Sequence, residues 1–252
     1  MIDWKDILFL IVVLISNIIQ SITGFAGTVL AMPFSIMLVG YNVAKPILNV
    51  LGIVISLGVI GTGYKSLNKK EFFKIIAIMS VDMVAGMVIT KQFHINPALL
   101  YKVLGGIVLF FVGIGVFNAL SQKRREKKGD TAEKKPGFWV NIILIIAGVV
   151  HGMFVCGGPL LVVYASQKMK GRDEFRVTVS AVWAALNTVI LFSDIRDGYF
   201  NPKLLVLMGI AIGILFGALW IGNVIFKHIN KKWFMIITYV LMGISGISLL
   251  IK

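Results

Sequence analysis

The chain has few charged residues and very few acidic ones. Only 14% of its 252 residues are charged and 11 are acidic, whereas 58% are hydrophobic and the mean hydropathy is +0.92. Soluble domains place about a quarter of their residues in charged side chains. The composition therefore excludes an ordinary water-soluble protein and indicates that the lipid bilayer is a main partner of the chain.

Cysteine and histidine are also scarce. The single cysteine, Cys156, excludes a disulfide within the chain and any cysteine-rich zinc or iron–sulfur cluster. Besides this cysteine, the chain has only three histidines that could bind a transition metal, which makes metal chemistry a poor explanation of function. We expect neither a metal nor a cofactor.

The scarcity of acids leaves a net charge of +14. A basic protein often binds nucleic acid, but that function needs a basic face on a polar domain, and no polar stretch here is long enough to form one. We therefore expect no nucleic-acid partner. The charge needs an explanation in terms of the membrane.

Apolar residues form ten segments, separated by short polar turns. They cover residues 7–22, 26–39, 44–63, 72–90, 99–120, 138–154, 159–167, 177–193, 204–226 and 233–251. A helix rises about 1.5 Å per residue and the bilayer core is about 30 Å thick, so segments 26–39 and 159–167 are too short to span it. Each short segment follows a glycine-rich turn, TGFAG at 23–27 or HGMFVCGGP at 151–159. Each pair thus predicts a helix, a break and a partial helix.

If the chain passes back and forth across the membrane through these ten segments, its lysines and arginines divide unequally between the two sides of the membrane. One side receives 18 of the 25 and the other receives seven. Because basic residues concentrate in cytoplasmic loops, the richer side is expected to be cytoplasmic, including linker 121–137, and both termini are expected outside. The same sides result whether the broken pairs cross the membrane or turn back within it.

The chain also shows signs of an internal duplication. Linker 121–137 separates a first repeat, 1–120, from a second, 138–252, and the triplet His-Ile-Asn recurs at 94–96 and 228–230, between the fourth and fifth segments of each half. An odd number of crossings, or three crossings and one re-entrant hairpin, inverts the second half relative to the first. The expected fold is an all-α integral membrane protein. It has two inverted repeats of about five segments each, roughly eight spanning equivalents, and broken or re-entrant helices that meet at mid-membrane.

The two breaks are the candidate binding site. New helices begin near Thr28 and Pro159, so two positively polarised helix ends would attract a small anion without a buried lysine or arginine. The candidate substrate-binding residues are the glycines and polar residues at and beside the breaks: Ser21, Thr23, Gly24, Gly27, Thr28, Asn49, His151, Cys156, Gly157, Gly158, Ser180 and Asn187. Alternatively, the polar side chains pair with backbone carbonyls across helices, as is common in membrane bundles.

Two residues are candidates for coupling transport to an ion. His151 either carries a proton or bonds a neighbouring group. Asp82 is the one acid well inside a long apolar segment, and it either couples a cation or makes a structural hydrogen bond.

The two glycine-rich motifs, GFAGTVLAMP at 24–33 and GVVHGMFVCGGPLLVVY at 148–164, resemble those of the TauE/SafE sulfite exporter family. The resemblance covers essentially the whole chain. The residues that match the motifs are Gly24, Gly27, Gly152, Gly157, Gly158 and Pro159. The resemblance implies a permease of the prokaryotic cytoplasmic (inner) membrane for sulfite, organosulfonates or related small anions.

We therefore expect a secondary transporter of a small sulfur-containing anion that works by alternating access. The alternative is an anion channel, or a carrier for another solute such as a carboxylate. An intramembrane enzyme using Cys156 and His151 is disfavoured, because five residues of separation do not stack two side chains on one helical face. The stripe Gly209, Gly213 and Gly217 serves either an internal helix contact or the seam of a homodimer.

Overall fold

The computed structural model describes residues 3–92, 139–155, 157–169, 171–228 and 231–251, with scattered positions between 102 and 116. Linker 121–137, Cys156 and most of the predicted segment 99–120 lie outside these residues, as do residues 94–96 and 229–230 of the repeated triplets.

The described part of the chain is helical and contains no strand, which confirms the all-α part of the predicted fold class. The helices are α1 (Trp4–Thr23), α2 (Ala26–Val39), α3 (Tyr41–Gly63), α4 (Lys69–Gln92), α6 (Trp139–Phe154), α7 (Gly158–Lys168), α8 (Arg172–Arg196), α9 (Pro202–His228) and α10 (Lys231–Leu250), and the short 3-10 helix η1 (Tyr64–Ser66) continues α3. Each coincides with a predicted apolar segment, with ends that differ by a few residues. Five described helices are long and apolar enough to cross a membrane: α1, α3 with η1, α4, α8 and α9. The chain is therefore a multi-pass membrane protein.

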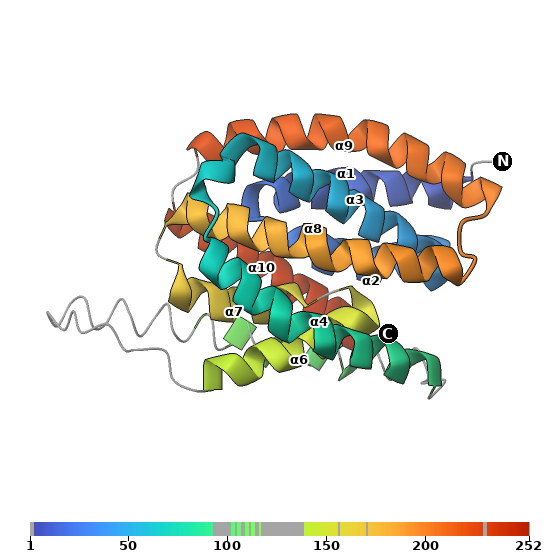
Figure 1. Ribbon diagram of the computed structural model, residues 1–252. Helices are drawn as coiled ribbons and strands as arrows, with labels where there is room; N and C mark the ends of the chain where they lie inside the picture. Colours follow the sequence, from blue (N-terminus) through green and yellow to red (C-terminus); the bar gives the residue numbers. More distant parts are fainter. Residues whose placement is uncertain are drawn as a thin grey trace, which may run out of the picture.

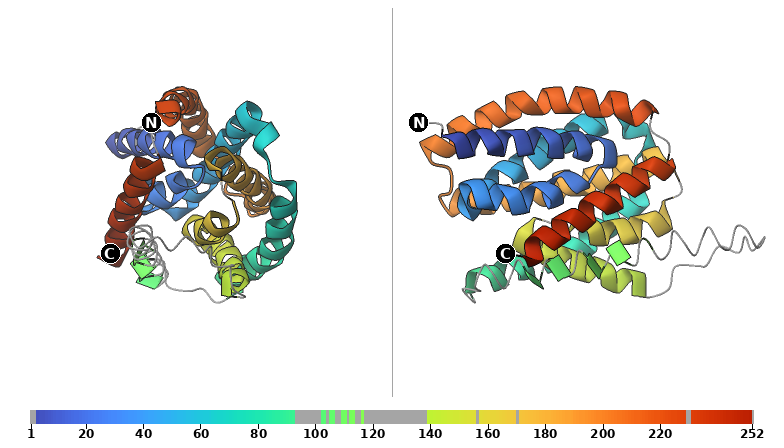
Figure 2. Two further views of the ribbon diagram at one scale, coloured as in Figure 1. Left: turned by 90° about the vertical axis from the view of Figure 1, so that its left-hand side faces the viewer. Right: turned by 180° about the vertical axis from the view of Figure 1, so that it is seen from behind.

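The broken pairs are antiparallel hairpins. Helix α2 packs along α1 and runs back toward the end where α1 begins, and α7 packs along α6 in the same way (Figures 1 and 2). The sequence left open whether these pairs cross the membrane or turn back within it. Two consecutive spanning helices would be antiparallel as well, so re-entrant hairpins stay a prediction.

The halves pack on one another in a reciprocal pattern. Helices α3 and α8 form an extensive central contact, α1 lies on α9, and α6 lies on α4 (Figure 2). Exchanging each helix of the first half for its equivalent in the second converts the α1–α9 contact into α6–α4, and α3–α9 into α8–α4. Each hairpin is thus held by the fourth helix of the other half.

Close helix approach at glycine maintains this packing. A Cβ added to Gly86 of α4 would fall on the carbonyl of Val149, and one added to Gly152 of α6 would fall on the carbonyl of Met83. The outward-facing Gly209, Gly213 and Gly217 of α9 have no other described atom within 4 Å of such a Cβ. They therefore make no close contact with another described helix, and a homodimer seam at this stripe stays a prediction.

Basic residues gather at one end of the bundle, here called the basic end, where α3 ends and α8 begins (Figure 1). Its described members are Lys65, Lys69, Lys70, Lys74, Lys168, Arg172, Arg176 and Lys227. At the opposite end, where α3 begins and α8 ends, the described members are Lys5, Lys45, Arg196 and Lys203. The predicted unequal division of lysines and arginines between the two sides therefore appears in the described part of the chain.

Candidate functional site

The first break is built by a glycine and two polar side chains. Helix α1 ends at Gly24, whose φ of 84° is left-handed and whose N–H donates to the carbonyl of Gln20 at 2.7 Å. The Thr23 hydroxyl oxygen accepts from the N–H groups of Phe25 (3.3 Å) and Ala26 (3.1 Å), and Gln20 Oε1 accepts from the Thr28 N–H at 3.0 Å. The start of α2 is therefore already capped. This differs from the expectation of freely exposed N–H groups, because Thr23 and Gln20 at the end of α1 cap the start of α2.

The second break has the same backbone plan but different side chains. Val155 takes the left-handed conformation (φ 57°), and its N–H donates to the carbonyl of His151 at 2.7 Å, as Gly24 does to Gln20. Helix α7 then begins at Gly158 with Pro159 in its first turn and with no side chain capping it. His151 thus stands where Gln20 stands in the first break, and the positively polarised end of α7 is left open.

Glycine is required where each new helix passes its predecessor. A Cβ on Gly27 would lie 2.5 Å from Gln20 Oε1, and one on Gly157 would lie 2.6 Å from the carbonyl oxygen of Ala147. Both distances are below van der Waals contact. These glycines shape the breaks without lining a cavity.

The two breaks touch one another. A Cβ on Gly158 would lie 3.2 Å from the carbonyl oxygen of Phe25 and 3.5 Å from Val29 Cγ2. Beside this contact is a cavity of about 10 Å³, lined by Gln20, Phe25, Thr28, Val29, His151, Val155, Gly158, Trp183 and Asn187. That volume is about the minimum for one water molecule, so the site is closed in this conformation.

Two nitrogen atoms at the cavity have no hydrogen-bond partner within the described part of the chain. The rings of His151 and Trp183 lie 4.6 Å apart, and their Nδ1 and Nε1 atoms are both unpaired. The two residues are only 2% and 4% exposed. Buried polar atoms are nearly always paired, so these two atoms point to an absent ligand or water.

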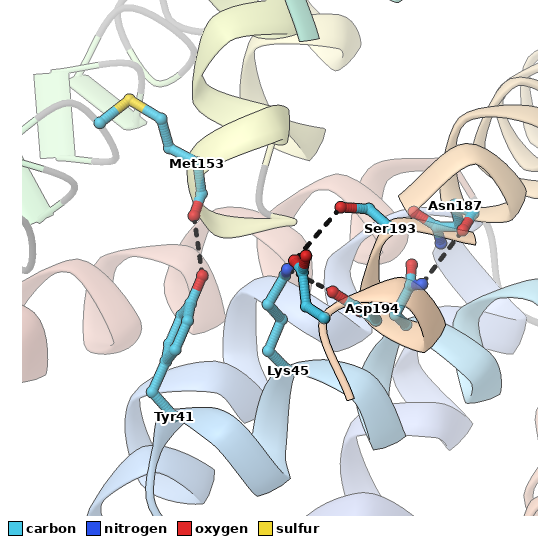
Figure 3. A network of polar contacts seen from close by, with 8 residues as sticks. Tyr41, Lys45, Met153, Asn187, Ser193 and Asp194 are labelled. Carbon is cyan, nitrogen blue, oxygen red and sulfur yellow. Dashed lines mark hydrogen bonds and ion pairs between the residues drawn. The ribbon is translucent and has the colours of Figure 1, made fainter. Parts of the chain in front are cut away.

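Asn187 connects the cavity to the seam between α3 and α8. His151 Nε2 lies 3.0 Å from Asn187 Oδ1, and Asn49 Nδ2 donates to the carbonyl of Asn187 at 3.0 Å. Figure 3 shows Asn187 on α8, at one side of the group of polar contacts that includes Lys45 and Asp194.

The structure brings together some of the predicted residues. Thr28, His151, Gly158 and Asn187 line the cavity. The others lie around it: Thr23, Gly24, Gly27 and Gly157 form the breaks, Asn49 lies behind Asn187, Ser180 lies beside Gly24, and Ser21 donates to the carbonyl of Leu219 at 3.4 Å.

Asp82 and Cys156 do not belong to the described site. Asp82 faces α6, because a Cβ added to Gly148 of α6 would lie 2.7 Å from the Cβ of Asp82. Asp82 does not line the cavity. Cys156 lies outside the described residues, so its pairing with His151 is not described.

Sequence reasoning missed five of the residues that line the cavity: Gln20, Phe25, Val29, Val155 and Trp183. The duplication contains the signal for Gln20, since it precedes Gly24 by the same interval that separates His151 from Val155.

The comparison with protein families agrees with this geometry. The family model for the sulfite exporter TauE/SafE matches residues 8–249. The chain belongs to the TauE/SafE sulfite exporter family. No curated protein and no solved structure was found to match it. The family match spans both hairpins and both halves, so the cavity lies within the transporter region itself.

Proposed function

We propose that this member of the family is a secondary transporter of a small sulfur oxyanion, sulfite or an organosulfonate, that works by alternating access. The observation that carries the proposal is the closed cavity between the two breaks, with the unpaired Nε1 of Trp183 at its wall. An indole N–H is purely a donor, so the missing partner must be an acceptor such as an anion oxygen.

The anion is held by neutral donors and helix ends. Trp183 donates its N–H, the open start of α7 contributes its positive end, and the N–H of Thr28 becomes available when Gln20 Oε1 moves aside. No lysine or arginine lines the cavity. An anion held without a buried full charge is released more readily, which a transporter requires at every cycle.

The closed cavity implies that the hairpins separate to admit substrate. Because α1 packs on α9 and α2 on α10, while α6 packs on α4, each hairpin moves with helices of the opposite half. This reciprocal packing supports two inverted repeats with roughly eight spanning equivalents, in which the hairpins are re-entrant.

The distribution of charge supports the orientation. We place the basic end, with linker 121–137, in the cytoplasm, and both termini outside the cytoplasmic membrane.

His151 is the proposed coupling residue. With Asn187 Oδ1 as acceptor, its Nε2 carries the proton and the neutral ring leaves Nδ1 bare. A proton taken up at Nδ1 turns this atom into a second donor for the anion. Asp82, the other candidate, lies away from the cavity, so we assign coupling to His151.

Transport by purified protein in proteoliposomes tests the proposal. Labelled sulfite or an organosulfonate should move with saturable kinetics, and Gly158→Leu should abolish the flux, because a leucine cannot fit against Phe25 and Val29 without filling the cavity. Gly213→Leu is the matched control, since it adds the same side chain to the open face of α9.

Unchanged flux in Gly158→Leu would contradict the proposed site. Flux that does not saturate would instead favour the alternative of an anion channel, and movement of carboxylates without sulfur anions would favour a carrier for another solute.

A further inference from the structure

A buried ion pair lies in the α3–α8 seam at the end opposite the basic one. Lys45 Nζ lies 2.6 Å from Asp194 Oδ1, and their side chains are 10% and 0% exposed (Figure 3). By contrast, the ion pair between Lys203 and Asp6, at 3.3 Å, has a lysine side chain that is 61% exposed. The Lys45–Asp194 pair therefore differs from a surface salt bridge in both burial and position.

The pair stands in line with the cavity. On α3, Asn49 follows Lys45 by one turn and donates to the Asn187 carbonyl. On α8, Asp194 follows Asn187 by about two turns, a distance of about 10 Å along the helix. Polar groups thus continue from the cavity wall to the ion pair, on the route that an anion would take toward the outer side.

Stability alone does not account for the pair. Removing two charges from water is costly, and well-packed apolar residues often stabilise a fold as well or better. The other half of the protein does without such a pair: Arg176 corresponds to Lys45, but Gly63 stands at the position that corresponds to Asp194. Arg176 instead donates to neutral oxygens, the carbonyl of Ser21 at 2.8 Å and Asn223 Oδ1 at 2.6 Å.

The segment that carries Lys45 is also tied to the second break. One turn before Lys45, the Tyr41 hydroxyl donates to the carbonyl of Met153 at 3.0 Å (Figure 3). Met153 lies near the end of α6, shortly before the left-handed Val155. Movement of the α6–α7 hairpin therefore reaches the ion pair through α3.

We propose that Lys45 is a second, transient anion-binding position on the outer path, and that Asp194 is its resident counter-ion. An oxyanion leaving the cavity takes the place of the Asp194 carboxylate on the Lys45 ammonium, and the carboxylate returns when the anion departs. The exchange replaces one anionic group of oxygen acceptors with another, so the ammonium is never left unpaired in the seam. This inference rests on the proposed transport function.

The decisive variants are Asp194→Asn and the double variant Lys45→Met with Asp194→Asn. The first leaves Lys45 without its competing carboxylate, so external sulfite should half-saturate exchange at a concentration lower by at least about tenfold, and maximal efflux should slow because the anion is retained. The second removes both charges and avoids an uncompensated buried charge. It should raise the external half-saturating concentration while sulfite bound in the cavity still stabilises the protein against heat. Lys203→Met is the matched control, since it removes a cation at the same end but off the path.

Wild-type flux separates this inference from the function on which it rests. Absence of sulfur-anion flux in the wild type would contradict the transport function itself. If the wild type transports sulfite and both variants keep its external half-saturation and maximal rate, the ion pair is structural and the second binding position is refuted.

Discussion

Replacing Trp183 with phenylalanine separates a binding role of the indole N–H from a packing role of the ring. Trp183 is 4% exposed, its Nε1 has no partner among the described residues, and its ring lies 4.6 Å from that of His151. Phenylalanine keeps an aromatic ring at this position but removes the donor. The substitution should therefore weaken anion binding much more than it weakens the fold.

The two effects differ in size because the N–H has a partner only when the anion is bound. A hydrogen bond to a charged group contributes about 1.5 to 3 kcal/mol. Its loss should raise the dissociation constant for sulfite by about 10- to 150-fold. In the ligand-free protein, an unpaired buried donor costs about 1 to 3 kcal/mol, and its removal offsets the apolar area lost with the smaller ring. The free energy of unfolding without ligand should consequently change by no more than about 1 kcal/mol.

Thermal unfolding of the detergent-solubilised protein measures both quantities. At a sulfite concentration about 100 times the wild-type dissociation constant, the ligand stabilises the wild type by about 2.7 kcal/mol. If the constant rises by about 10- or 100-fold, the same concentration stabilises the variant by only about 1.4 or 0.4 kcal/mol. Trp220→Phe is the control, because Trp220 is 71% exposed and lies away from the cavity.

One outcome would refute the reasoning. If Trp183→Phe lowers the ligand-free melting temperature strongly but leaves the stabilisation by sulfite equal to that of the Trp220→Phe control, the indole acts only in packing.

Two further predictions concern coupling and helix packing. His151→Gln should abolish the pH dependence of sulfite flux because it removes the titratable ring, whereas Asp82→Asn should retain it; the reverse pattern would transfer the coupling role to Asp82. Gly152→Ala should destabilise the protein by about 1 to 3 kcal/mol, because its methyl group would fall on the carbonyl of Met83, while Gly213→Ala meets no described atom within 4 Å and should be neutral; equal melting temperatures for these two variants in detergent would contradict the close packing of α4 on α6.

The sequence predicted the frame of the fold because hydrophobic length and glycine-rich turns are local signals. Helix α2 occupies the predicted 26–39, and the two breaks occur at the predicted turns. How the hairpins pack on the other half depends on contacts between distant helices, such as α1 with α9. Hydropathy does not record those contacts, so this packing became clear only in the structure.

The candidate site was predictable in outline for the same reason. Glycines mark the places where backbones approach closely, and these positions were identified. The side chains that face the cavity come partly from α8, and the apolar sequence around Trp183 gives no sign that it lies there. The binding role proposed for Trp183 rests on the missing partner of its N–H, which is a property of three-dimensional packing.

The two halves place different residues along the contact between α3 and α8, so the two ends of this contact are not equivalent. The same spacing that relates Gly24 to Val155 relates Gly52 to Trp183 and Gly63 to Asp194. In both of the latter pairs the first half has glycine, and the second half has a donor at the cavity or a carboxylate beyond it. A perfectly duplicated protein would present the same groups toward both sides of the membrane. At these two positions the first half leaves room and the second half places a polar group. On the proposed pathway, an anion that moves from the cavity toward Lys45 therefore meets a different sequence of partners from one that moves toward Arg176.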